Sequence, residues 1–253
     1  MPPAAFKDHF SSSATDYARW RPADYPPQLA RWLAGQAPAR ALALDCGCGS
    51  GQFSTLLAGQ FERVVATDAS AQQLAQAQAH PRVRYRVAAA EHSGLDDRSV
   101  DLVSAAQAAH WFDLPAFYAE ARRVLKPRGC LALVSYGVPR LEGAPGRLLD
   151  ELHDRLLGPY WPPERRHVQT GYRLLDFPFD ELAAPALQMR AQWTLPQMLG
   201  YIRTWSALRR AEAEHGPGVA GEILHRLGAA WGDGARPRSI RWPLSLRVGL
   251  LAG

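Results

Sequence analysis

The chain is poor in lysine. Lys7 and Lys126 are its only lysines, and 27 of the 29 basic residues are arginines spread along the whole sequence. The formal net charge of +5 and the pI near 9.4 would suit a nucleic-acid partner, but dispersed arginines form no basic stripe along which a phosphate backbone could lie. Because alanine, glycine and proline are also abundant, codon bias explains the charge, and we expect no nucleic-acid partner.

Long apolar runs and cysteines are scarce too. No stretch approaches the ~18 apolar residues of a membrane span, and residues 1–10 lack the apolar core of a signal peptide. The three cysteines are odd in number, and Cys46 and Cys48 are too close to pair without strain. We therefore expect a cytoplasmic protein with no membrane partner. A metal or redox role for these two cysteines is less economical than two small buried side chains, so we expect no metal.

The composition is that of an ordinary globular protein. Of 253 residues, 47% are hydrophobic and 21% are charged, which excludes a disordered chain. This length allows one large domain, or one domain with an insertion, around a sizeable core.

Strand and helix patterns alternate over the first 136 residues. Apolar runs predict four strands, at 41–44, 64–67, 100–105 and 130–136, and residues 83–87 alternate apolar with basic side chains, as an outer strand would. Helix patterns follow near 24–35 and over 52–59, and two more helices begin at Ser70 and Asp113, which can cap them. This alternation predicts an α/β fold with a doubly wound, mostly parallel sheet. Ligands of such sheets bind beyond the carboxyl ends of the strands.

The pattern changes after about residue 137. Five of the eight tryptophans lie in this second half, mostly in segments with helix patterns, such as 195–214 and 219–231, and residues 240–251 alternate like a strand. We expect residues 1–136 to form a ligand-binding core. Residues 137–253 should form an inserted helical cap and the last strands of the same sheet.

A glycine cluster lies between a predicted strand and a predicted helix. Asp45 ends the strand, and Gly47, Gly49 and Gly51 follow. Glycines allow backbone amides to approach a ligand closely. The dinucleotide fingerprint requires its third glycine one residue later, at position 52, which is glutamine. Asp68 ends the next strand, where a carboxylate can accept hydrogen bonds from two ribose hydroxyls.

Six motifs occur in the order and spacing of the class I S-adenosylmethionine (SAM)-dependent methyltransferases with a type 11 methyltransferase domain, which the chain resembles. They are Asp45–Gly51, Thr67–Ser70, Ala90–Glu91, Val100–Val103, His110–Phe112 and Leu125–Gly129. The segments Tyr17–Pro22 and Trp242–Leu246 are similar to the trans-aconitate-methyltransferase-like branch. The resemblance implies a Rossmann-like sheet of seven strands, SAM as cofactor and S-adenosylhomocysteine as product.

The resemblance also implies roles for individual residues. Asp45 and the three glycines would hold the methionine part of SAM, and Asp68 would bind the ribose. Ala69 would flank the adenine, and Glu91 would face its edge.

Further roles follow for residues around the predicted cofactor site. Gln107 would contact the amino-acid part of SAM, and His110 and Trp111 would face the substrate. Tyr17 and Arg21 would lie over the cofactor as a lid.

The best interpretation is methyl transfer to a small molecule, with O-methylation of a carboxylic acid as the leading hypothesis. Arginines of the cap could orient such an anion, namely Arg173, Arg203, Arg209 and Arg210. One alternative is N- or C-methylation of another metabolite with His110 as base. Two others are an NAD-dependent dehydrogenase and a SAM-binding protein without activity. The oligomeric state stays open.

Overall fold

The computed structural model describes residues 25–252, together with Trp20 and Pro22. Seven strands follow one another across the main sheet in the order β3-β2-β1-β4-β5-β8-β6. Their bounds are β1 Leu42–Cys46, β2 Arg63–Asp68, β3 Val83–Val87, β4 Val100–Ala106, β5 Leu125–Tyr136, β6 Asp180–Glu181 and β8 Arg238–Leu250. The strands β1 to β5 pair in parallel, and β8 is antiparallel to β5 and β6. The predicted doubly wound, seven-stranded sheet is confirmed.

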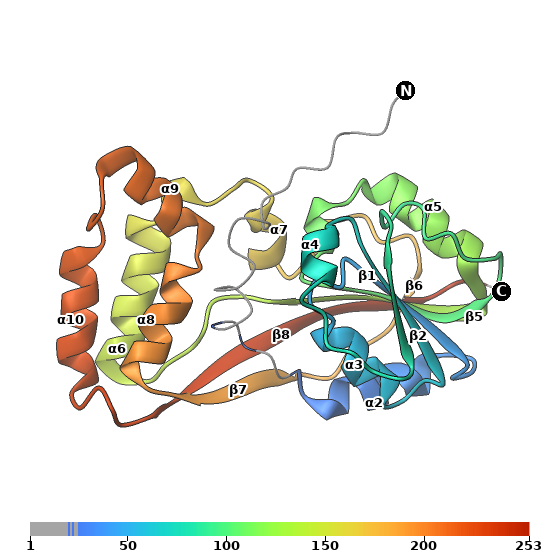
Figure 1. Ribbon diagram of the computed structural model, residues 1–253, viewed down its shortest axis with the longest axis horizontal. Coiled ribbons are helices and arrows are strands. Elements are labelled where there is room, and N and C mark those ends of the chain that lie inside the picture. Colours follow the sequence, from blue (N-terminus) through green and yellow to red (C-terminus); the bar gives the residue numbers. More distant parts are fainter. Residues whose placement is uncertain (1–19, 21, 23–24, 253) are drawn as a thin grey trace.

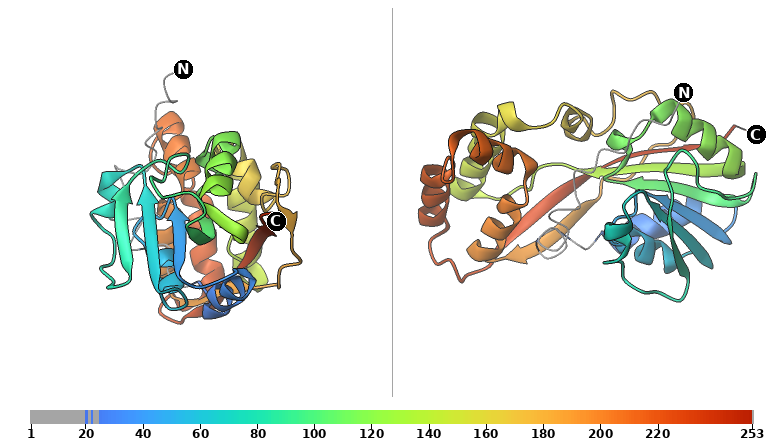
Figure 2. Two further views of the ribbon diagram at one scale, coloured as in Figure 1. Left: turned by 90° about the vertical axis from the view of Figure 1, so that its right-hand side faces the viewer. Right: turned by 45° about the horizontal axis from the view of Figure 1, so that its top comes forward.

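Helices cover both faces of this sheet (Figures 1 and 2). Those of the first half are α2 Pro27–Gln36, α3 Gln52–Ala58, α4 Ala71–Leu74, the 3-10 helix η2 Ala109–Trp111, and α5 Leu114–Val124. All five residues of β1 are buried, as expected of a central parallel strand that reads as one apolar run. The predicted outer strand, β3, lies at the sheet edge, where Val87 is 62% exposed.

The second half adds a group of helices beside the sheet (Figure 1). These are α6 Gly143–Asp150, the π-helix η3 Glu151–Leu156, the 3-10 helix η4 Gly158–Tyr160, α7 Arg165–Gln169, α8 Leu195–Arg203, α9 Ser206–His215 and α10 Gly221–Trp231. The long strand β8 runs between the two parts of the molecule. Its first half pairs with β7, Gln188–Trp193, and its second half pairs with β5.

The single helix expected over 195–214 is wrong, because the structure divides it between α8 and α9. Thr204 donates its hydroxyl to the Tyr201 carbonyl at 2.7 Å, and Trp205 takes an extended conformation. The break lets the Trp205 ring, 3% exposed, pack against Trp161 and His153. Burial of a large indole thus outweighs the continuous helix pattern.

The strand order reverses between β1 and β4, which pair side by side although β2 and β3 lie between them in sequence. This reversal is the point at which open α/β sheets bind ligands. The residues that follow β1, β2 and β4 therefore define the candidate site. Within the described residues, no helix is long and apolar enough to cross a membrane.

Candidate active site

The glycine loop after β1 is packed so tightly that two of its positions exclude a side chain. Gly47, Gly49 and Gly51 all have positive φ, at 66°, 55° and 83°, a region that only glycine enters without cost. A Cβ at Gly47 would lie 2.5 Å from the Cβ of Ala108, and one at Gly51 would overlap the Tyr85 hydroxyl. At Gly49 the nearest atom would be 3.8 Å away. There is therefore free space beside the backbone at Gly49, whereas close packing fixes the loop at Gly47 and Gly51.

Asp68, the predicted ribose ligand, is fixed at the end of β2. Its two carboxylate oxygens accept hydrogen bonds from the backbone N–H groups of Gly49 and Ser70, each at 2.8 Å. Partial burial raises the pKa of this carboxyl. Each carboxylate oxygen can accept more than one hydrogen bond, so Asp68 can hold the loop and still receive ribose hydroxyls. Ala69 follows it and is half-buried.

Asp45 is fully buried beneath the loop. It accepts hydrogen bonds from the hydroxyls of Ser54 on α3, at 2.6 Å, and Ser104 on β4, at 2.8 Å. Burial raises its pKa to about 6, against the opposing effect of the two hydroxyls. Asp45 thus joins β1, α3 and β4. Sequence reasoning missed both serines, since Ser104 lies 59 residues away and no local motif includes either of them.

Glu91 connects the segment after β3 to α5. Its Oε1 accepts a hydrogen bond from the Asp113 backbone N–H at 2.9 Å. Asp113 caps α5 by accepting from the Ala116 N–H, as the sequence predicted. Glu91 is half-buried, and its position beside this cap is compatible with the predicted place near the adenine.

Gln107, directly after β4, carries a buried acceptor that has no hydrogen-bond partner in the described structure. It has a positive φ of 55°, and its Nε2 donates to the Tyr136 carbonyl at 2.8 Å. That bond identifies the other side-chain atom as oxygen, and this Oε1 is buried without a donor. An unpaired buried acceptor is costly, so the position suits a ligand N–H group. The contact between Gly47 and Ala108 places it beside the glycine loop.

His110 and Trp111 lie on η2, which begins two residues after Gln107. The His110 Nδ1 is 2.9 Å from the hydroxyl of Tyr172, and its ring centroid is 4.7 Å from that of Trp111. Both side chains are half-buried. Tyr172 lies just after α7, 62 residues further along the chain, and no local motif links the two residues.

Two predicted lid residues and four predicted cap arginines remain. Tyr17 and Arg21 lie outside the described residues. The four cap arginines are exposed, and three of them donate to nearby backbone carbonyls: Arg173 to Thr170, Arg209 to Thr204 and Arg210 to Tyr160.

Cys46 and Cys48 act as the small side chains that the sequence suggested. Cys46 is fully buried and Cys48 is half-buried. Burial raises the pKa of both thiols, so they stay protonated and are poor nucleophiles.

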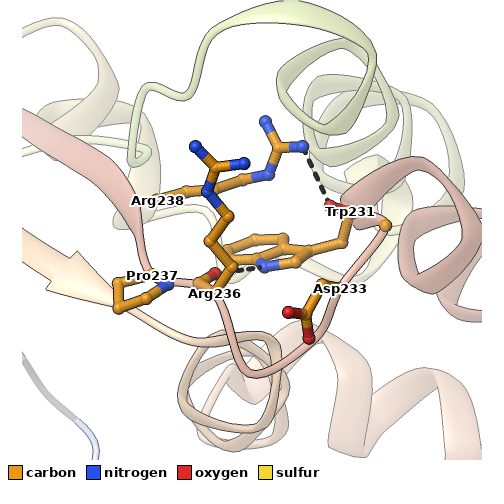
Figure 3. Close-up of a pocket in the computed structure, with 6 residues that line it drawn as sticks. Trp231, Asp233, Arg236, Pro237 and Arg238 are labelled. Atoms are coloured by element: carbon orange, nitrogen blue, oxygen red, sulfur yellow. Dashed lines mark hydrogen bonds between the residues drawn. The ribbon is translucent and has the colours of Figure 1, made fainter.

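A separate pocket lies between the end of α10 and the start of β8, away from the glycine loop (Figure 3). Arg238 donates to the Trp231 carbonyl at 2.9 Å, and the Trp231 indole donates to the Arg236 carbonyl at 3.2 Å. Asp233 accepts from the Ala235 N–H at 2.9 Å. These polar groups form hydrogen bonds with one another and so stabilise the turn between α10 and β8.

Comparisons with known proteins agree with this arrangement. Residues 44–133 match the family described as "Methyltransferase domain". A Dictyostelium discoideum protein named as a methyltransferase is 34% identical over 208 residues, which are 81% of this chain and 79% of that protein. An uncharacterised methyltransferase of Mycobacterium tuberculosis is 40% identical over 126 residues, or 49% of this chain and 51% of its own.

A solved structure extends the similarity over almost the whole chain. It is of a protein from Anaeromyxobacter dehalogenans described as a type II methyltransferase, and it is 49% identical with a TM-score of 0.87. The match covers 92% of this chain and 98% of that one. Together with the loop and sheet described above, these similarities show that the chain belongs to the class I SAM-dependent methyltransferases.

Proposed function

We propose that this methyltransferase methylates a carboxylate oxygen of a small organic acid, as in the trans-aconitate-like branch that the chain resembles. One observation carries the proposal. Asp45, Asp68 and Glu91 at the carboxyl edge of the sheet all accept hydrogen bonds from the protein's own N–H or O–H groups. With the cofactor bound, Asp68 and Glu91 would face its ribose and adenine, and Asp45 is fully buried beneath the loop, so we expect none of the three to meet the acceptor as a general base. An amine or hydroxyl acceptor needs such a base, whereas an ionised carboxylate needs none.

The site residues fit the cofactor. Gln107 Oε1, a buried acceptor without a donor, suits the ammonium group of the methionine part. Asp68 would receive the ribose hydroxyls, Ala69 and Glu91 would lie beside the adenine, and Asp45 would hold the loop from beneath. When bound, SAM supplies a methyl group made electrophilic by the sulfonium.

The transfer step needs little covalent chemistry from the protein. A carboxylate oxygen forms a bond to the methyl carbon while the carbon–sulfur bond breaks and its electron pair stays on sulfur. The two opposite charges cancel and no proton moves. The protein lowers the barrier by aligning the reactants and excluding water. We infer that η2 and the cap enclose the acceptor. We also propose that the enzyme acts in the cytoplasm.

The test is transfer of a labelled methyl group from SAM to a panel of small mono-, di- and tricarboxylic acids. The primary amides of the same acids serve as matched controls. We expect labelled products only from the acids, and we expect alkali to release the label as methanol because it cleaves a methyl ester. A labelled product stable to alkali, or equal labelling of the amides, would contradict the proposal.

A further inference from the structure

The cap contains a buried histidine with one unpaired ring nitrogen. His153 lies on the π-helix η3 and is 1% exposed. Its Nδ1 is 2.6 Å from a carboxylate oxygen of Asp154, whose side chain is 73% exposed. The Nε2 atom is buried and has no hydrogen-bond partner in the part of the chain that the structure describes. The proposed methyl transfer gives this residue no role.

The pair lies in a wide helical turn. Neighbouring residues of an ordinary α-helix do not face each other. In η3 the Leu157 N–H donates to the carbonyl of Leu152, five residues earlier, at 2.9 Å, and in this turn the side chains of His153 and Asp154 meet. Single π-turns are rare and occur frequently at functional sites.

The Asp154 carboxylate decides where the proton of the neutral ring lies. An ionised carboxylate only accepts hydrogen bonds, so Nδ1 donates, and the neutral ring has its lone pair at Nε2. Protonation would place an N–H and a positive charge at Nε2, where none of the described residues offers an acceptor. A buried cationic N–H without an acceptor costs more than a buried lone pair without a donor. The surroundings of Nε2 therefore favour the neutral ring.

Aromatic rings surround the imidazole. The ring centroids of Trp161 and Trp205 lie 4.8 and 5.5 Å from that of His153, and the Trp161 indole donates to the His153 carbonyl at 3.1 Å. Trp205 lies in the break between α8 and α9, and its ring contacts Tyr201. Tyr201 in turn contacts Trp242 on β8. These contacts connect His153 to the strand that joins the cap to the sheet.

The charged groups near His153 act in both directions. Burial lowers the pKa of His153, and Arg165, whose guanidinium lies 4.8 Å from the Trp161 ring centroid, acts in the same direction. The carboxylates of Asp154 and of Asp150, at the end of α6, oppose this effect. Other titratable groups on the elements packed against η3 form pairs without His153, namely Glu151 with Arg226, Asp150 with Arg140 and Tyr160 with His215.

We propose that the His153–Asp154 pair makes the cap sensitive to pH. The neutral ring supports the packing of Trp161 and Trp205, whereas protonation at Nε2 loosens this packing and weakens binding of the acceptor. The effect on the acceptor rests on the proposed function, in which the cap encloses the acceptor, and the effect on the cap does not. Because the unfolded chain binds the proton more readily, the stabilising contribution is full above about pH 6.5 and is lost as the pH falls.

Nitrogen NMR of the imidazole rings tests the pair directly, with the His153 signals assigned from a His153→Gln variant. The exposed His225 on α10 is the matched control. We expect a neutral His153 ring protonated at Nδ1, and titration of His153 at a lower pH than His225. In Asp154→Asn, which keeps an acceptor for Nδ1 but removes the charge, His153 should titrate at a lower pH still. A neutral ring protonated at Nε2, or titration at or above the pH of His225, would overturn the proposal.

Thermal unfolding tests the effect on the cap. Between about pH 7.5 and about pH 5.5, the unmodified protein should lose ~2–4 °C of Tm relative to His153→Gln, and His225→Gln should behave like the unmodified protein. Asp45 also titrates in this range, but it is present in every variant, so its effect cancels. If His153→Gln does not fold, Asp154→Asn replaces it and should lose more Tm than the unmodified protein. Equal losses in the compared proteins would show that His153 does not control the cap.

Kinetics separate this proposal from the proposed function. For an acid that the unmodified enzyme methylates, the same fall in pH should raise KM about fivefold more than in His153→Gln. Affinity for S-adenosylhomocysteine should change equally in both proteins, because the cofactor site lies in the other half of the chain. Equal changes in KM would show that His153 does not act on the acceptor, although the acid would still be methylated. If no acid is methylated, the proposed function fails, and NMR and unfolding still decide whether the pair responds to pH.

Discussion

Two side chains at the carboxyl edge of the sheet hold their surroundings in place and are also the proposed ligands of the cofactor. Asp68 accepts from Gly49 and Ser70, so the carboxylate proposed for the ribose also holds the loop that would cover the methionine part. The amide N–H of Gln107 donates to the Tyr136 carbonyl, and its Oε1 has no donor in the described structure. Two ligands with the same adenosine part can separate these contributions. S-adenosylhomocysteine has the amino-acid part, and methylthioadenosine lacks it.

Asp68→Ala should weaken both ligands, because both contain the ribose. We expect a loss of ~1–3 kcal/mol in each binding free energy, the range for hydrogen bonds to a charged group. Isothermal calorimetry measures this, and Glu62→Ala, at an exposed carboxylate next to β2, is the control. Unchanged affinity for methylthioadenosine would mean that the ribose lies elsewhere.

Gln107→Met should discriminate between the two ligands. The substitution keeps the volume but removes both the acceptor and the amide N–H that donates to Tyr136. Loss of the acceptor should weaken binding of S-adenosylhomocysteine by about 1–2 kcal/mol. Methylthioadenosine has no ammonium group and should bind as before. Calorimetry with both ligands checks this, and equal losses for the two would contradict the assigned contact.

The raised pKa of Asp45 should make the protein less stable as the pH rises, which is the opposite of the usual effect of an aspartate. Its folded-state pKa of about 6 lies above the unfolded value of ~3.9, so the folded protein binds the proton more tightly. Its stabilising contribution is full below pH ~3.9 and is lost as the pH rises to about 6. Relative to Asp45→Asn, the unmodified protein should lose about 3 kcal/mol of unfolding free energy across that window. Denaturant unfolding at several pH values measures the difference, which would be flat if Asp45 were not buried as a titrating group.

At the scale of elements, the loop between β1 and α3 depends on contacts from β3 and from the segment after β4. Tyr85 on β3 fills the space where a side chain at Gly51 would lie, and Ala108 after β4 does the same at Gly47. The positive φ angles and these contacts act together. The loop is therefore shaped in advance of ligand binding, which lowers the entropic cost of binding.

Gly51→Ala tests this packing, with Gly35→Ala as the control. Gly51 has a φ of 83° and its Cβ would overlap the Tyr85 hydroxyl, so we expect a loss of ~1–3 kcal/mol in stability. Gly35 lies in α2 with nothing within 4 Å of its Cβ position, and alanine there should stabilise by about 0.5–1 kcal/mol. Thermal and denaturant unfolding report both values. A neutral Gly51→Ala would show that the loop relaxes freely.

At the scale of the whole molecule, the long strand β8 connects the helices of the second half to the main sheet (Figure 2). Arg247 on this strand pairs with Glu181 at 2.8 Å and donates to the carbonyls of Tyr172 and Leu175. One guanidinium on β8 thus binds both β6 and the turn after α7. We keep the division at residue 136, into a SAM-binding core and a cap that completes its sheet, as a proposal.

Arg247→Leu should loosen this attachment. Two carbonyls and a carboxylate would lose their donor, and we expect a loss of ~1–3 kcal/mol in unfolding free energy. Arg203→Leu, at an exposed position on α8, should change it by less than about 0.5 kcal/mol. Equal effects of the two substitutions in denaturant unfolding would argue against the role of Arg247.

The sequence by itself determined the elements of the first half of the chain and their order. Apolar runs such as residues 41–44 placed the buried strands, and the glycine spacing placed the loop, because burial and backbone freedom act on neighbouring residues. The same local signals put Asp68 at the end of β2 and Asp113 at the cap of α5.

Only the tertiary structure decided which side chains meet. Ser104 reaches Asp45 across 59 residues, Tyr172 reaches His110 across 62, and Arg247 reaches Tyr172 across 75. The break at Trp205 likewise depends on Trp161 and His153, which belong to other elements. Contacts over such separations leave no periodic trace in the sequence, because they depend on how finished elements pack and not on the residues beside them.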